Sequence, residues 1–219
     1  MAVKKVVVLG LKQLMQKKYR KLEGLPEDIL KVFGELCEGF SMLVWGRSAS
    51  GKSNFLMVFI KCLMVYGKVL YIGLEEGFNL TMQNKAGNHM NMDDHNGKVE
   101  FANHTMTIEA LYVRLRRRKS PKFIVIDSLQ YWGITYPQYQ KLKEDFPDKS
   151  FIYISHAKGR DPDGKTGPKI QYDVDIKVWM EGGVAHVASR YHMRGDQFFV
   201  IDPVKAKKYW GRKLKGMVS

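Results

Sequence analysis

The chain has 219 residues, 45% of them hydrophobic, and a formal net charge of +14 at pH 7. This length supports one well-buried domain, and a positive excess of this size favours a polyanionic partner, nucleic acid before an acidic membrane surface. The two cysteines, Cys37 and Cys62, form no CxxC pair, which argues against a disulfide framework and leads us to expect reduced thiols in the cytoplasm.

The predicted elements begin with a basic helical extension over residues 1–34, whose clearest helix starts near Pro26. Between 35 and 203, short apolar runs alternate with helical segments. Strands are expected at 41–46, 68–74, 99–103, 122–128 and 150–156, and helices at 52–67, 107–119 and 136–146. Near-continuous apolar strands that alternate with helices indicate a mostly parallel sheet with helices on both faces. The apolar part of the first of these helices contains Lys61 and is too short to span a bilayer, so we expect no membrane partner.

The pattern changes after residue 172. Three apolar runs follow one another with only short glycine turns between them, at 173–180, 184–192 and 197–202. Short turns between strands favour antiparallel pairing, so these runs are predicted to extend the sheet. Residues 204–219 are predicted to form a basic tail. The expected fold class is therefore α/β, with a mostly parallel central sheet and antiparallel strands at its C-terminal end.

The strongest motif is GRSASGKS, residues 46–53, which fits G-x-x-x-x-G-K-[ST] between a predicted strand and a predicted helix. In such a loop, backbone N–H groups and the helix N-terminus hold phosphates, the lysine contacts the β- and γ-phosphates, and the serine binds Mg²⁺. A simple glycine-rich turn is the disfavoured alternative. The predicted cofactors are ATP and Mg²⁺. The predicted nucleotide-binding residues are Gly46, Arg47, Ser48, Ala49, Ser50, Gly51, Lys52, Ser53 and Asn54.

Carboxylates follow two of the predicted strands. Asp127 ends the buried run FIVID, where a carboxylate is costly without a cation or hydrogen-bond donors, so we predict that it holds Mg²⁺ together with Ser53. The alternative is a helix N-cap. Glu75 and Glu76 end the run LYIGLEE, at the edge where open α/β sheets bind ligands. We choose Glu75 as the catalytic base, and Glu76 remains its competitor; an acidic first turn of the next helix is the alternative for either.

Five segments, in their order along the chain, resemble the motifs of RecA-like ATPases. The similarity is to the branch of RadA and the DnaB helicases, with KaiC-type proteins nearby, and covers roughly residues 35–202. It is carried by GRSASGKS, YIGLEEG, FIVIDSLQ, IYISHAKG and ASRYHMRGDQFFVI. The resemblance implies a RecA-like P-loop domain over 35–203, a catalytic glutamate at Glu75 or Glu76, and a homo-oligomeric ring or filament. The chain shows no four-cysteine zinc ribbon, protease-like domain or helical helicase domain, which indicates an accessory ATPase of the kind that would suit a phage or mobile element.

The resemblance also implies roles for residues after Asp127. His156, beside Ser155, matches the polar sensor that detects the γ-phosphate, and the segment behind it matches a loop that contacts DNA. The DNA contacts fall to Lys158, Arg160, Lys165 and Lys169. Arg190 and Arg194 match, with looser spacing, cations that reach the phosphate of a neighbouring subunit. The alternatives are a mobile surface loop with a hydrogen-bonded histidine at its base, and two exposed arginines beside a turn.

The basic residues gather in three clusters, at 4–21, 114–119 and 205–215, and the last contains Tyr209 and Trp210, which suit base stacking. We therefore expect an ATPase that acts on single- or double-stranded DNA in recombination, repair or replication. The rival is a KaiC-like assembly protein, switched by nucleotide, whose basic surface meets a protein or a membrane. The polar run 88–95 fits no metal-binding spacing, and a polar loop is expected there.

Overall fold

The computed structural model describes residues 7–90, 92–192, 197–214 and 216. Within this part of the chain eight strands form one sheet in the order β10-β9-β8-β1-β5-β4-β2-β3. Their bounds are β1 Ser41–Gly46, β2 Val69–Gly73, β3 Val99–Ala102, β4 Phe123–Asp127, β5 Ser150–Ser155, β8 Ile176–Glu181, β9 Val184–Ser189 and β10 Gln197–Val200. In this order, the six neighbouring strands β8, β1, β5, β4, β2 and β3 pair in parallel, and β9 runs antiparallel to both β8 and β10.

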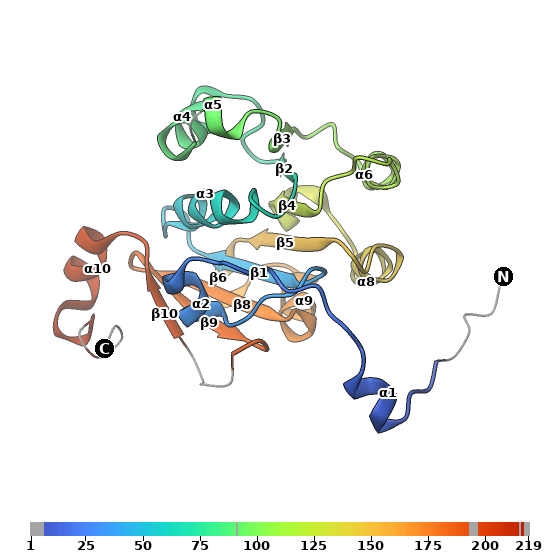
Figure 1. Cartoon of the computed structure of the whole chain (residues 1–219). Coiled ribbons are helices and arrows are strands. Elements are labelled where there is room, and N and C mark those ends of the chain that lie inside the picture. Colours follow the sequence, from blue (N-terminus) through green and yellow to red (C-terminus); the bar gives the residue numbers. More distant parts are fainter. Residues whose placement is uncertain (1–6, 91, 193–196, 215, 217–219) are drawn as a thin grey trace.

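Helices cover both faces of this sheet (Figure 1). On one face lie α2 Glu27–Phe33, α3 Lys52–Leu63 and α4 Leu80–His89; on the other lie α6 Ile108–Leu115, α7 Leu129–Trp132, α8 Tyr136–Asp145 and α9 Gly167–Asp173. Successive strand residues point to opposite faces. Met42 and Val44 of β1 accordingly pack with the first set, and Leu43 packs with the second. Because both faces are buried, both alternating sets must be apolar, which explains the continuous hydrophobic runs.

The predicted α/β class with a mostly parallel sheet, helices on both faces and C-terminal antiparallel strands is confirmed. Several element boundaries were wrong. The helix expected at 107–119 ends at Leu115, so most of its basic run lies beyond the helix. The strand expected at 173–180 begins only at Ile176, because residues Gly167–Asp173 form α9. Other helices that we did not predict are α4, α7 and the short α5, Met92–His95, together with a C-terminal helix described below.

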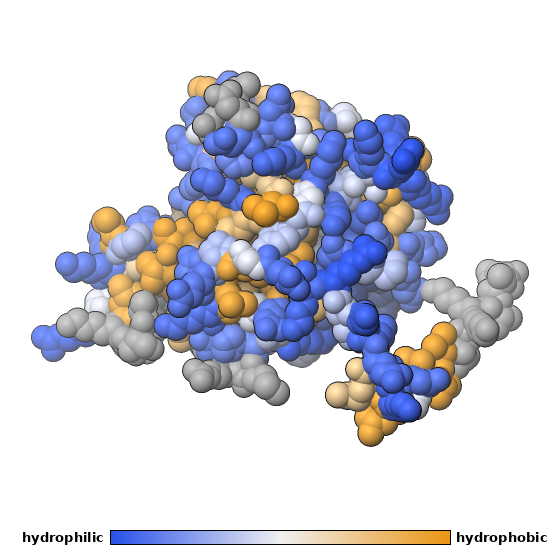
Figure 2. Space-filling model, in the orientation of Figure 1, coloured by the Kyte–Doolittle hydropathy of each residue, from blue (hydrophilic) through white to orange (hydrophobic). Residues whose placement is uncertain are grey.

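The N-terminal region is only partly helical. It contains α1, Leu11–Met15, and α2, whose Ile29, Val32 and Phe33 belong to the core. Residues 7–20, here called the N-terminal arm, are exposed throughout and lead away from the sheet (Figure 1). Space-filling colours show apolar surface gathered on this arm (Figure 2), where the side chain of Val8 is 85% exposed. The arm therefore carries apolar side chains that are not buried within its own chain.

The C-terminal segment, for which we predicted a basic tail over 204–219, contains a helix that packs on the domain. Residues Pro203–Trp210 form α10, followed by a 3₁₀ turn at Gly211–Leu214. Ala206 is fully buried, and a Cβ at Gly182 would lie 2.5 Å from the Tyr209 ring. The helix is thus packed on the turn between β8 and β9. No helix in the described ranges is long and apolar enough to cross a membrane.

Candidate nucleotide site

The predicted phosphate loop lies between the end of β1 and the start of α3, at the carboxyl edge of the parallel strands. Ala49 and Gly51 have positive φ angles, 58° and 104°, which turn the backbone into a tight loop. A Cβ on Gly46 would lie 2.5 Å from the Met180 carbonyl oxygen and 2.6 Å from Ser50 Oγ, so only glycine fits there. The loop therefore delivers the N-terminus of a helix of twelve residues to the sheet edge.

Lys52 bends back over the loop that precedes it. Its ammonium donates to the carbonyl oxygens of Gly46, at 2.7 Å, and of Arg47, at 2.9 Å. Burial lowers the pKa of Lys52, and the carboxylates of Asp127 and Glu75 oppose that shift. A partly desolvated ammonium held beside the loop is a strong donor for an anion, since charge-assisted hydrogen bonds strengthen as water is excluded.

The loop faces a cavity of about 370 Å³. The segments that follow β1, β2, β4 and β5 contribute to its wall together with α4; the lining residues are Ser48, Ala49, Ser50, Gly51, Lys52, Ser53, Asn54, Glu75, Glu76, Lys85, Asp127, Ser128, Ile154, Ser155 and His156. The hydroxyl oxygens of Ser50 and Ser128 are buried here without a hydrogen-bond partner in the protein. Buried hydroxyls are almost always satisfied, so their environment fits a ligand rich in acceptor oxygens, as a polyphosphate is.

Asp127 lies in this wall at the end of β4, and the peptide bond that follows it is cis. Its carboxylate accepts a 2.5 Å hydrogen bond from the Tyr71 hydroxyl of the adjacent strand β2. Burial raises the pKa of Asp127, while the Tyr71 hydrogen bond opposes the rise. Carboxylate and hydroxyl oxygens are the ligands that Mg²⁺ prefers. Asp127 and Ser53 line the same cavity and thus fit the predicted magnesium site.

The two candidate bases have different partners. Glu75 lies exposed in the cavity wall, and its Oε2 atom is 3.3 Å from His156 Nε2. Glu76 makes a 2.5 Å ion pair with Lys85 of α4 and accepts a 3.2 Å hydrogen bond from Thr81. Glu76 is therefore held by two groups on the neighbouring helix. Within the part of the chain that the structure describes, the Glu75 carboxylate contacts one side chain, that of His156, which was predicted as the sensor. This arrangement leaves the carboxylate available to a water molecule.

His156 follows β5, which lies between the phosphate-loop strand β1 and the Asp127 strand β4. Gln130 of α7 fixes the segment around it: its side chain donates to Ser155 Oγ at 2.8 Å and to the Asp163 carbonyl oxygen at 3.0 Å, and accepts from the His156 N–H at 3.3 Å. Sequence reasoning missed Gln130, although it stands in the quoted run FIVIDSLQ. His156 and the segment that follows it are therefore linked through the Gln130 side chain.

The segment after His156 is more ordered than the long loop that we expected. It forms a two-stranded hairpin, β6 Ala157–Lys158 and β7 Asp161–Pro162, and then α9. All four predicted DNA-binding cations are exposed on it, namely Lys158, Arg160, Lys165 and Lys169. The hairpin is anchored by the Trp45 indole, which donates to the Arg160 carbonyl oxygen at 2.8 Å.

Arg190, one of the two predicted arginine fingers, does not reach the cavity of its own chain. Arg190 follows β9 and lies at the amino ends of the parallel strands, whereas the cavity lies at their carboxyl ends. Its guanidinium is 3.3 Å from a carboxylate oxygen of Asp175. Asp175 in turn accepts hydrogen bonds from the backbone and hydroxyl of Ser41, the first residue of β1. Arg194 lies outside the described residues.

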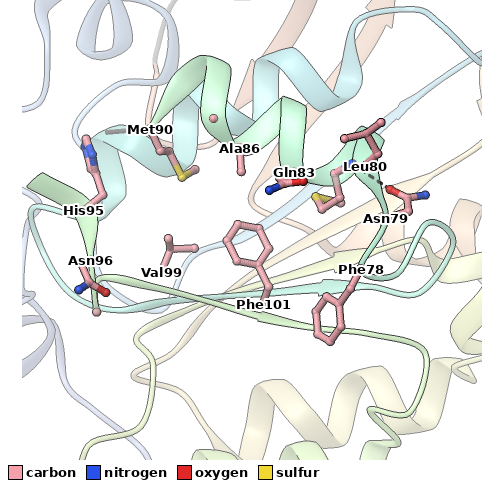
Figure 3. Close-up of a pocket in the computed structure, with 13 residues that line it drawn as sticks. Phe78, Asn79, Leu80, Gln83, Ala86, Met90, His95, Asn96, Val99 and Phe101 are labelled. Carbon is pink, nitrogen blue, oxygen red and sulfur yellow. Dashed lines mark hydrogen bonds between the residues drawn. The ribbon is translucent and has the colours of Figure 1, made fainter. Parts of the chain in front are cut away.

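A second, larger cavity of about 710 Å³ lies at the β3 edge of the sheet, between that strand and α4 (Figure 3). Phe101 and Val99 of β3 face Ala86 of α4 and Met90, which follows α4, across it, and Phe78 closes one end. Its wall is mostly apolar and contains none of the predicted nucleotide residues. Among the residues that the structure describes, no group of three or more acidic, histidine or cysteine side chains forms a metal site, in the run 88–95 or elsewhere.

Comparison with known proteins does not identify a relative. No family model matches the chain, and a search of curated proteins finds no match. The assignment of the site therefore depends on its geometry and on the motif resemblance.

Proposed function

We propose that this protein binds Mg-ATP and hydrolyses it. The observation that carries the proposal is the meeting, in one cavity, of the phosphate loop with Lys52, Asp127 and the Glu75–His156 pair. These groups come from β1, β4, β2 and β5, which end at the same edge of the sheet. Phosphate release from ATP, measured with and without Mg²⁺, tests the proposal.

Each group has a distinct task in this scheme. Backbone N–H groups of 48–53 and the start of α3 hold the phosphates, and Lys52 exchanges its carbonyl partners for phosphate oxygens. Ser53 and Asp127 hold Mg²⁺, which neutralises phosphate charge when bound. Glu75 accepts a proton from the attacking water. His156 contacts Glu75, so it orients the base and responds to the γ-phosphate.

The order of strands supports a RecA-like arrangement as the finer fold. β5 lies between β1 and β4, so His156 stands between the phosphate loop and Asp127. This order is compatible with the resemblance in the motifs, and the additional β8-β9-β10 strands continue the sheet beyond β1.

We further propose that DNA is the partner and that the segment 157–169 binds it. Replacing Lys158, Arg160, Lys165 and Lys169 by alanine is expected to weaken DNA binding and to reduce the slope of log affinity against log salt by about 3, since each lost phosphate contact contributes about 0.7 to 0.9. The measurement is fluorescence anisotropy of a labelled oligonucleotide at several salt concentrations.

The control for this variant removes the same charge from exposed lysines outside the segment and outside the three basic clusters, Lys31, Lys61, Lys98 and Lys141. Its slope should remain close to that of the natural chain. If both quadruple variants lose the same slope, the segment has no special part in DNA binding. If the natural chain shows no salt-dependent binding to DNA at all, the KaiC-like alternative gains instead.

Assembly into homo-oligomers is proposed from complementary apolar surfaces. The N-terminal arm exposes Val7, Leu11 and Met15, each more than 70% exposed, and the cavity between α4 and β3 exposes Phe78 and Leu80, each 68% exposed. In Figure 1 the arm lies on the other side of the molecule from α4, so a second copy supplies the arm that fills the cavity. Burial of such side chains is worth roughly 1.5–3 kcal/mol each.

Deletion of residues 1–20 is expected to leave a monomer that still binds ATP but hydrolyses it poorly, because Arg190 and Arg194 act on the phosphate of a neighbouring copy. Sedimentation velocity measures the assembly and phosphate release the turnover. A substitution of charge for the cavity residue Phe78, Phe78→Asp, should have the same effect on assembly. A truncated chain that assembles normally, or a monomer with full turnover, would contradict this proposal.

A further inference from the structure

One line of side chains on β8 combines aromatic rings with cations. Lys177, Trp179 and Glu181 alternate with buried residues and therefore point to the same side of the sheet, the side of α9. Successive members are about 7 Å apart along the strand. Each of them contacts a side chain from another segment of the chain. These partners are aromatic rings and a cation, the residue types that bind nucleic acid.

The partners are an aromatic ring for the cation, a cation for the ring, and a phenol for the carboxylate. Lys177 Nζ lies 5.8 Å from the ring centroid of Tyr172 on α9, and the guanidinium carbon of Arg160 lies 5.3 Å from that of Trp179. The Tyr209 hydroxyl on α10 donates to Glu181 at 3.0 Å. We call Tyr172, Lys177, Arg160, Trp179 and Tyr209 the β8 track.

The rings at the two ends of the β8 track are accessible. Tyr172 is 80% exposed and Tyr209 is 57% exposed. Trp179 between them is half-buried and backed by His186, at a ring distance of 4.7 Å. Rigid aromatic faces beside cations are the combination with which proteins hold unpaired bases.

Charge around the β8 track also favours a polyanion. Arg47 of the phosphate loop and Arg160 of the hairpin both lie close enough to Tyr209 to oppose the rise in its pKa that the Glu181 hydrogen bond causes. Lys205, one turn before Tyr209 on α10, donates to the carbonyl oxygen of Ala49 in the phosphate loop. The end of the β8 track at Tyr209 is therefore basic, and it adjoins the proposed nucleotide site.

We propose that the β8 track binds single-stranded nucleic acid by stacking bases on Tyr172 and Tyr209 while Lys177 and Arg160 contact phosphates. A base can stack on a protein ring only if its own face is free, which is not the case for a base inside a duplex, so a strand bound in this way must be unpaired. This inference rests on the proposed function only for its nucleic-acid partner, and not on ATP hydrolysis.

The test compares Tyr172→Ala/Tyr209→Ala with Tyr172→Phe/Tyr209→Phe in the full chain, by fluorescence anisotropy with labelled oligothymidylate, oligouridylate and a blunt DNA duplex. Loss of a stacked ring costs about 5- to 150-fold in affinity. The alanine pair should therefore lose at least about 25-fold for single strands, and the phenylalanine pair, which keeps both rings, should bind like the natural chain. The two labelled single strands distinguish DNA from RNA as the preferred source of the bases.

Tyr19→Ala is the matched control, because Lys17 lies 5.3 Å from that exposed tyrosine ring outside the β8 track; its affinity for single strands should not change. The alanine pair should keep the salt slope of the natural chain, since neither ring carries charge, whereas Lys177→Ala should reduce it by about 0.7. The proposal is overturned if the alanine pair binds single strands normally, if the phenylalanine pair loses as much, or if duplex binding falls equally.

The outcomes also separate this proposal from the ATPase. A chain that releases phosphate from ATP but binds single strands independently of both tyrosines, or does not bind them, refutes the β8 track and leaves the ATPase intact. A chain that binds single strands through the tyrosines but releases no phosphate supports the track and refutes the ATPase.

Discussion

Replacing Lys52 by alanine is expected to abolish hydrolysis and to weaken ATP binding. The ammonium is the charged donor at the phosphate loop, fixed by its bonds to Gly46 and Arg47. Losing a charge-assisted hydrogen bond costs about 1.5–3 kcal/mol, which corresponds to a roughly 10- to 150-fold weaker affinity. Turnover should fall by a further factor of about 100 to 1000, since the lost charge stabilises the transferring phosphoryl group. Equilibrium binding of labelled ATP and phosphate release measure the two effects separately.

The control is Lys61→Ala, which removes an exposed lysine from the far end of the same helix, α3. It should bind and hydrolyse ATP like the natural chain. Unchanged ATP affinity in Lys52→Ala, with the fold preserved by circular dichroism, would show that the loop 46–53 does not hold phosphates.

Replacing Glu75 by glutamine is expected to remove hydrolysis by a factor of about 100 to 10,000, the contribution of a positioned general base, while ATP affinity stays as it was. The amide keeps an oxygen for the 3.3 Å contact with His156 but cannot take a proton from water. Single-turnover hydrolysis of bound ATP measures the chemical step directly.

Glu76→Gln is the matched control for this prediction. It disrupts the ion pair with Lys85 and should leave most of the turnover, because Glu76 is held by Lys85 and Thr81 and does not take the proton from water. If Glu76→Gln is inactive and Glu75→Gln is active, the base is Glu76. If both variants remain active, the end of β2 does not supply the base.

Much of the sheet could be predicted from the sequence because its strands are buried on both faces. Runs such as FIVI in β4 and FIYI in β5 are hydrophobic and buried at every position, a pattern that surface strands do not show. The helix α4 was missed because its sequence LTMQNKAGNH buries only Met82 and has little apolar periodicity. A local signal was present: the Asn79 side chain caps the helix by accepting from the Met82 N–H at 2.9 Å.

The candidate site, too, could be predicted from the sequence only in part. The loop 46–53, Asp127 and the pair Glu75 and Glu76 are local patterns at strand ends, and parallel strands bring such ends together at one edge. The side chains that fix them come from elsewhere in the chain. The Tyr71 hydroxyl of β2 donates to Asp127 on the adjacent strand β4, and Lys85 of α4 forms an ion pair with Glu76. Lys205 of α10 donates to a carbonyl oxygen of the phosphate loop. Such pairings depend on tertiary packing, for which the local sequence patterns carry no signal.

The most direct test of the account is steady-state phosphate release by the full chain with ATP, in Mg²⁺ and in EDTA, with and without oligonucleotide. The account predicts release that requires Mg²⁺, is lost in Lys52→Ala and Glu75→Gln, and persists in Lys61→Ala. Absence of phosphate release in Mg²⁺, at protein concentrations where the chain assembles and with oligonucleotide present, would contradict it, as would release that is the same in EDTA or in Lys52→Ala.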